Sequence, residues 1–327
     1  MKQLGNLAVK WSAVQFVLLL GCFDAQGADM SSPPPPAAPN APDLPWYDDG
    51  QVYITDRLQA VALWLDDFFA DPRIETQKHA SARLSVLFNA FYSGVENADH
   101  DGVRFRGGAD LPHFDERLRL LITSDAESAM TGRDLAGTAQ DEIKETEGSV
   151  GLGYLVSRRP KSKFRVSGSL SGGLTPEVRF TARHIYTQPW TATTTSHLTS
   201  TLYWRSEDGS GISTLFDYEW VADPNTLWRY TLFGNYGEQT KVIDWSSQVL
   251  WARRLNDQEA IQVRGGIQGV DKPDAVINEG WIKFGYRRNL WRSWLFFEME
   301  PGLSWAIQEE YAVEPTIALR LEVHFRR

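Results

Sequence analysis

The stretch 212–236, ISTLFDYEWVADPNTLWRYTLFGNY, consists of two segments in which apolar and polar residues alternate on either side of a short turn. Apolar side chains occupy nearly every second position up to Trp220, and a similar alternation resumes from Trp228 after a turn at Asp223–Asn225. Successive side chains of a β-strand point to opposite faces of the sheet. The stretch therefore predicts two antiparallel strands, each with one apolar face and one polar face.

The same period of two continues from about residue 79 to the end of the chain, with turn clusters of Asp, Asn, Gly, Pro and Ser between the segments. Fourteen segments can be distinguished, at about 81–93, 102–111, 116–124, 147–157, 163–173, 176–187, 190–205, 209–221, 225–238, 242–255, 258–270, 276–288, 292–305 and 311–325. An even number of antiparallel strands brings both ends of a closed barrel to one side. The three N-terminal segments are the least regular, so twelve strands is the alternative to fourteen.

Alternation alone fits a soluble β-sandwich as well as a membrane barrel. Two further features favour the barrel. Segments of nine or more residues match a tilted membrane strand, whereas globular strands usually have about five or six residues. Indole rings also prefer the headgroup level of a bilayer, and several tryptophans lie near predicted strand ends. The tryptophans that predict two interfacial girdles are Trp190, Trp204, Trp220, Trp228, Trp291, Trp294 and Trp305.

The last segment, 311–325, alternates apolar residues with polar ones up to Phe325. In this the chain resembles Gram-negative outer-membrane β-barrel proteins, whose last strand typically ends in an alternating apolar segment with an aromatic residue at or near the terminus. The resemblance covers about residues 79–327 and points to no individual family. It implies a transmembrane antiparallel up-and-down β-barrel in the cell outer membrane, with the lipid bilayer and the barrel-assembly machinery as partners. Leu321, Val323 and Phe325 would form the assembly signal, although two arginines follow them, which departs from the usual pattern.

The N-terminal region carries export signals. A basic start and an apolar run too short to cross a bilayer predict a signal peptide over 1–27. Alternatively the leader ends at residue 21 and Cys22, the only cysteine of the chain, is lipidated. The proline-rich segment 28–50 predicts a disordered linker that favours extended polyproline II.

A helix is predicted between the linker and the barrel, within a periplasmic segment at 51–78. Apolar residues fall three or four apart over 54–70, with acidic residues between them. Such a helix most often packs on its own domain. Docking of a periplasmic partner through 54–70 is an alternative, and residues 46–78 could also plug the barrel formed by 79–327.

The composition excludes several classes of function. The chain has 327 residues with 33 basic and 42 acidic side chains, a net charge of −9 that is unsuited to binding nucleic acid. A single cysteine excludes an intrachain disulfide and a thiolate zinc site. No apolar run approaches twenty residues, which excludes a helical membrane protein. Phosphate loops, dinucleotide fingerprints and His-Glu-x-x-His zinc motifs do not occur, so no cofactor or metal is expected.

If the apolar faces meet lipid, the opposite faces line the lumen with charges of both signs. Turn positions place Glu219 near Arg229, and Lys283 and Arg287 near two glutamates of the next strand. Such charges form either a lattice that braces the wall or a narrow channel whose charges tune selectivity. The predicted lumen-lining residues are Arg165, Arg179, Arg183, Asp217, Glu219, Arg229, Arg264, Lys283, Arg287, Glu298, Glu300 and Arg320.

The sequence thus predicts an outer-membrane barrel that acts as a narrow passive pore or a structural envelope protein. A module that binds a periplasmic partner through the N-terminal helix is the alternative, and a barrel-embedded hydrolase is the third hypothesis. No complete catalytic motif occurs, because Ser196 and His197 lie on opposite faces of one strand. The other histidines, including His184 and His324, are isolated in the sequence and more consistent with polar fill or surface than with metal ligands. The chain is therefore predicted not to be an enzyme.

Overall fold

A computed structural model describes residues 61, 62, 64–66, 68 and 69, together with 82–93, 100–110, 117–123, 148–171, 176–273 and 275–326. The predicted signal peptide, Cys22 and the proline-rich linker lie outside these residues. The strands are β1 (Ala82–Ser93), β2 (His100–Asp110), β3 (Leu118–Thr123), β4 (Ser149–Arg159), β5 (Ser162–Ser171), β6 (Val178–Pro189), β7 (Thr194–Arg205), β8 (Gly209–Asp223), β9 (Thr226–Gly237), β10 (Ile243–Asn256), β11 (Glu259–Val270), β12 (Val276–Asn289), β13 (Leu295–Ala306) and β14 (Glu314–Arg326). A short 3-10 helix, η3 (Ile307–Glu309), precedes β14.

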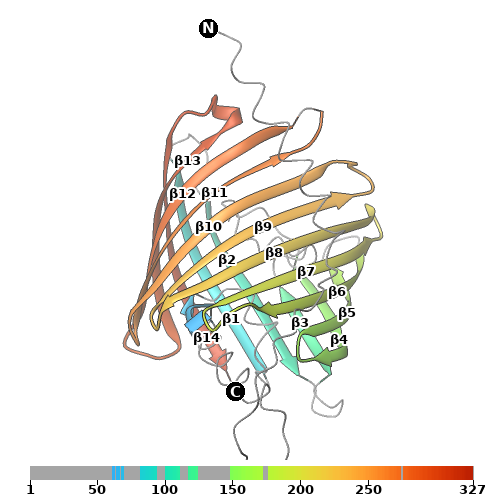
Figure 1. The fold of residues 1–327 in the computed structure, drawn as a ribbon, viewed down its shortest axis with the longest axis horizontal. Helices are drawn as coiled ribbons and strands as arrows, with labels where there is room; N and C mark the ends of the chain where they lie inside the picture. Colours follow the sequence, from blue (N-terminus) through green and yellow to red (C-terminus); the bar gives the residue numbers. More distant parts are fainter. Residues whose placement is uncertain are drawn as a thin grey trace, which may run out of the picture. The chain divides into compact units, whose positions relative to one another are not determined.

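The strands form one closed antiparallel barrel (Figure 1). Each strand pairs with its neighbours in sequence, and β14 closes the sheet by pairing with β1, with Leu84 opposite Phe325. The predicted up-and-down barrel of fourteen strands is therefore confirmed, and the alternative of twelve is not needed. We call the end where β1 begins and β14 finishes the terminal end, and the opposite end the far end. The β8–β9, β10–β11 and β12–β13 turns lie at the terminal end.

The hairpin quoted above shows how the sequence produces the wall. Trp220 of β8 stands opposite Trp228 of β9, and Glu219 stands opposite Arg229. The turn is held by the Asn225 backbone N–H, which donates to the Asp223 carboxylate at 2.8 Å. Because side chains alternate between the two faces, this register turns both tryptophans outward and both charged residues inward.

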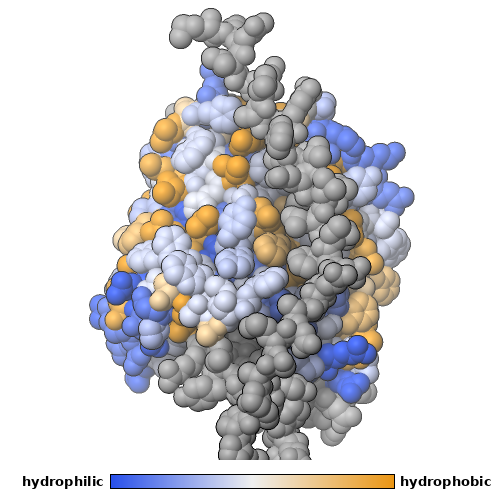
Figure 2. All heavy atoms as spheres, viewed as in Figure 1, coloured by the Kyte–Doolittle hydropathy of each residue, from blue (hydrophilic) through white to orange (hydrophobic). Residues whose placement is uncertain are grey.

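The two faces of the barrel differ in composition. Outward positions such as Ile212, Tyr218 and Ile282 are exposed large apolar residues. Inward positions include Arg229 and Arg287, each only 1 % exposed. Figure 2 shows orange and near-white residues over much of the strands, with deep blue gathered towards their ends. A soluble domain buries its apolar residues and exposes its charges, so this barrel is arranged for an apolar surrounding.

A helical segment lies within the same compact unit as the barrel, residues 54–327. Of the predicted helix at 54–70, the structure describes part of 61–69, where the Phe69 backbone N–H donates to the Leu65 carbonyl at 2.8 Å. Leu65 and Phe68 are buried on one side of it. Among the residues described, no helix has the length and apolar character needed to cross a membrane.

Candidate functional site: the charged inner face

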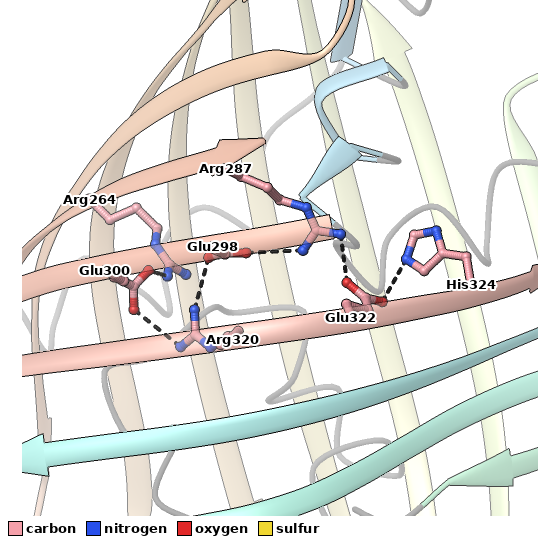
Figure 3. Close-up of polar contacts among 7 residues, drawn as sticks. All are labelled: Arg264, Arg287, Glu298, Glu300, Arg320, Glu322 and His324. Atoms are coloured by element: carbon pink, nitrogen blue, oxygen red, sulfur yellow. Dashed lines mark hydrogen bonds and ion pairs between the residues drawn. The ribbon is translucent and has the colours of Figure 1, made fainter. Parts of the chain in front are cut away.

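Among the residues that the structure describes, the inner face of the barrel carries two larger groups of ion-paired side chains, besides the separate pair of Arg179 and Glu177. The first, which we call the β12–β14 network and which includes a partner on β11, is drawn in Figure 3 except for Lys283. It consists of Arg264, Lys283, Arg287, Glu298, Glu300, Arg320, Glu322 and His324. The second, the β7–β9 cluster, consists of Asp66, His197, Asp217, Glu219, Arg229 and Thr231.

Arg287 is the centre of the first half of the β12–β14 network. Its Nη1 lies 3.0 Å from Glu298 Oε2, and its Nη2 lies 2.6 Å from Glu322 Oε2. Glu322 is also 2.7 Å from His324 Nε2. The guanidinium thus bridges carboxylates of two different strands through one contact to each, which its fixed fork of N–H donors allows.

Arg320 continues the network towards the far end (Figure 3). Its Nη1 donates to Glu298 Oε1 at 2.9 Å, and its Nη2 donates to Glu300 Oε1 at 3.3 Å. Glu300 also pairs with Arg264 and lies 3.7 Å from Lys283 Nζ. Acidic and basic groups therefore alternate along a continuous chain from β11 to β14, so each buried charge faces an opposite one.

The β7–β9 cluster is centred on Arg229. Its Nε donates to Glu219 Oε1 at 2.7 Å, while its Nη2 donates to both carboxylate oxygens of Asp66, at 2.8 and 3.0 Å. On β9, the Thr231 hydroxyl donates to Asp217 at 2.6 Å. Unlike the β12–β14 network, this cluster includes a residue that does not belong to the wall.

A hydroxyl, an imidazole and a carboxylate follow one another across β6, β7 and β8. Thr187 Oγ1 is 3.0 Å from His197 Nδ1, and His197 Nε2 is 3.6 Å from Glu219 Oε2. The second distance is too long for a hydrogen bond, and Glu219 is engaged by Arg229. The imidazole therefore lacks the close carboxylate contact that orients the base of a hydrolytic triad.

The strand register places all twelve predicted lumen residues on the inner face. Arg165 and Arg183 are neighbours on β5 and β6, and Arg183 donates to Thr201 at 3.1 Å. Nearer the far end, Arg179 Nε donates to Glu177 at 2.5 Å. The remaining nine belong to the two groups defined above.

The residues predicted to face lipid lie on the outer surface or in turns. The tryptophans are exposed except for Trp305, which packs across Gly280 and leaves no room there for a side chain. Leu321 and Phe325 are also exposed, and Val323 is half-buried.

Two histidines on the inner face, which stand alone in the sequence, have acidic neighbours in the fold. His197 lies beside Glu219 and His324 beside Glu322. The register of β7 and β8 places Asp217 opposite His197, and Glu219 is its diagonal neighbour on the same face. The contact of Asp66 with Arg229 has no signal in the sequence. Within the described ranges, no group of three or more His, Cys, Asp or Glu side chains is arranged to hold a metal ion.

No protein-family model matches the chain, and no curated protein matches it. Among solved structures, the chain is similar to the KdgM porin, with 6 % identity, a TM-score of 0.36, and coverage of 74 % of this chain and 99 % of the porin. OprD of Pseudomonas aeruginosa has 9 % identity, a TM-score of 0.42, and coverage of 75 % and 95 %. OccAB2 of Acinetobacter baumannii has 10 % identity, a TM-score of 0.44, and coverage of 76 % and 98 %.

The architecture itself assigns the class. A closed antiparallel barrel with an apolar outer face and a charged inner face is a form that satisfies every backbone hydrogen bond within a bilayer. The chain therefore has the fold of a membrane-spanning antiparallel β-barrel.

Proposed function

We propose that this protein is a narrow passive pore for small polar solutes. The observation that carries the proposal is the polar inner face of a closed barrel of fourteen strands. A barrel of eight strands is filled by its own side chains, while one of about 16 to 18 strands leaves an aqueous channel. A barrel of intermediate size with bulky inward arginines supports a restricted channel rather than a wide one.

The charges of the inner face support a role in selecting solutes. Glu298 and Glu300 lie opposite arginines and a lysine, so a passing ion meets both signs along the wall. Such paired charges tune selectivity without creating a strong net field.

The test is single-channel conductance of the purified full-length protein in a planar bilayer. We expect stepwise currents, and we expect Lys283→Ala to change ion selectivity because Lys283 faces inward. Arg288→Ala is the matched control, since Arg288 belongs to the same strand but its side chain is 53 % exposed on the outer face. Absence of any conductance would favour a structural envelope protein, and equal effects of both substitutions would mean that the current does not pass through the lumen.

Docking of a periplasmic partner through residues 54–70 is less well supported. The apolar residues best suited to hold a partner, Leu65 and Phe68, are buried against the barrel of the same chain.

The remaining proposals concern the outer face. Exposed tryptophans near strand ends support two interfacial girdles, and the exposed Leu321 and Phe325 support an assembly signal read by the barrel-assembly machinery.

A further inference from the structure

The inner face of the barrel carries an apolar patch at the terminal end. Its members come from several strands from β8 to β13 and lie near the turns that join them. Leu227 and Ala260 have no exposed surface at all. An apolar surface facing a water-filled lumen would be unfavourable, so this patch requires a cover. The patch consists of Val221, Leu227, Leu250, Ala252, Ala260 and Phe296.

The segment 61–69 supplies that cover. Ala62, Leu65 and Phe68 belong to the same apolar cluster, and Phe68 packs edge-on against the ring of Phe296 at 5.7 Å. Leu65 is only 2 % exposed. Burial of these apolar side chains removes them from water, which favours the seated position of the segment.

A buried ion pair fixes the position of the segment on the patch. Asp66 is 3 % exposed, and its two carboxylate oxygens accept hydrogen bonds from Nη2 of Arg229. A buried carboxylate needs such a partner, because burial of an unpaired charge is costly. The contact therefore specifies where the segment lies within the lumen.

Removal of Asp66 leaves the ion pair of the wall in place. Without Asp66, Arg229 retains Glu219 at 2.7 Å, so the wall keeps a complete ion pair. Loss of the Asp66 contact thus weakens the seating of the segment while leaving the barrel intact.

We propose that the described residues of the segment 61–69 form a plug seated in the terminal end of the lumen, with the Asp66–Arg229 ion pair as its latch. The inference rests on the proposed pore function, because a plug can limit conductance only in a barrel through which solutes pass. The plug limits conductance when seated, and its release opens the terminal end.

Conductance of full-length variants tests the plug. We expect Asp66→Asn and Leu65→Asp each to raise the mean conductance, since the first removes the latch charge and the second places a charge on the apolar patch. Glu177→Gln is the matched control, because Glu177 is also a buried carboxylate paired with an arginine but lies near the far end. If wild type conducts and neither plug variant differs from it, the plug is wrong while the pore stands. If no variant conducts, the pore proposal itself fails.

Thiol protection tests the seating without any current. Ala62→Cys in a Cys22→Ser background should react slowly with a maleimide, because Ala62 is buried. Adding Asp66→Asn should accelerate the reaction on the order of tenfold, which corresponds to about 1.4 kcal/mol. Glu207→Cys in an exposed turn gives the reference rate. Equal rates for Ala62→Cys and Glu207→Cys would overturn the proposal.

Discussion

The β12–β14 network and the β7–β9 cluster are both buried ion-pair groups on the inner face, but they connect different parts of the protein. The network joins only wall residues, and Arg287 links β12 to β13 and to β14. The cluster joins the wall to a segment that is not part of it, through Arg229 and Asp66. The first arrangement stabilises the barrel, whereas the second attaches a separable element to it.

The largest expected effect comes from the centre of the network. Arg287→Met leaves Glu298 and Glu322 without their shared guanidinium, and breaking a buried pair in this way costs about 3–5 kcal/mol. The loss of unfolding free energy is measured by chemical unfolding in detergent, with the heat-modifiable gel shift as the readout of the folded fraction. Arg288→Met is the control, as Arg288 points outward. Equal destabilisation by both substitutions would contradict the bracing role.

A smaller loss is expected for Glu300→Gln. Glu300 faces Arg264, Lys283 and Arg320, and the amide oxygen of glutamine can still accept hydrogen bonds from them. We therefore expect a total loss of about 1.5–3 kcal/mol, the contribution of one hydrogen bond to a charged group. The neighbouring cations would repel one another once the carboxylate is gone. The same unfolding assay measures this variant, with Glu310→Gln in an exposed turn as the control. A midpoint unchanged from wild type would show that Glu300 does not hold these cations together.

Asp66→Asn should lower the unfolding free energy by about 1–1.5 kcal/mol, since Arg229 keeps Glu219 and the amide can still accept a hydrogen bond. The unfolding midpoint in detergent is the measurement. A loss as large as that of Arg287→Met would mean that the segment is an integral part of the wall, and the distinction between the two groups would disappear.

The smallest effect is expected at a carboxylate that belongs to neither group. The hydroxyl of Ser210 donates to Glu238 at 2.5 Å, and this contact holds the pKa of Glu238 below its usual value. A lowered pKa in the folded state stabilises the protein above the unfolded pKa, and this contribution is lost as the pH falls through the folded pKa. Glu238→Gln should therefore lower stability slightly at neutral pH and leave it unchanged below the folded pKa of Glu238, which flattens the acid side of the stability profile. A loss of the same size below that pKa would contradict this.

The strands of the barrel wall could be predicted from the sequence because the alternation within each segment indicates a strand and shows which side chains share a face. The alternation in 212–236 fixes which residues share a face, and the turn at Asp223–Asn225 fixes that Glu219 meets Arg229. These are local properties, and the strand ends predicted from them lie within a few residues of the observed ones.

The latch could not be predicted, because Asp66 and Arg229 are 163 residues apart and no turn connects them. The helix period shows that Leu65 and Phe68 share a face, but it does not show what that face covers. Apolar residues such as Leu227 and Phe296 also interrupt an otherwise polar inner face, and from the sequence alone they look like exceptions to the alternation rather than a docking patch.

The pairing of β14 with β1 has a consequence for folding. Arg83 stands opposite Arg326, so the last hydrogen-bonded ladder joins the two extremes of the barrel sequence. All other ladders join consecutive strands and can form locally. The β1–β14 ladder joins segments separated by nearly the whole domain, so its formation has a larger loop-closure entropy cost. Until it forms, β1 and β14 are open edges that can pair with another chain. Closure is thus the slow, aggregation-exposed step, and loss of the final strand would leave a sheet with two permanent edges.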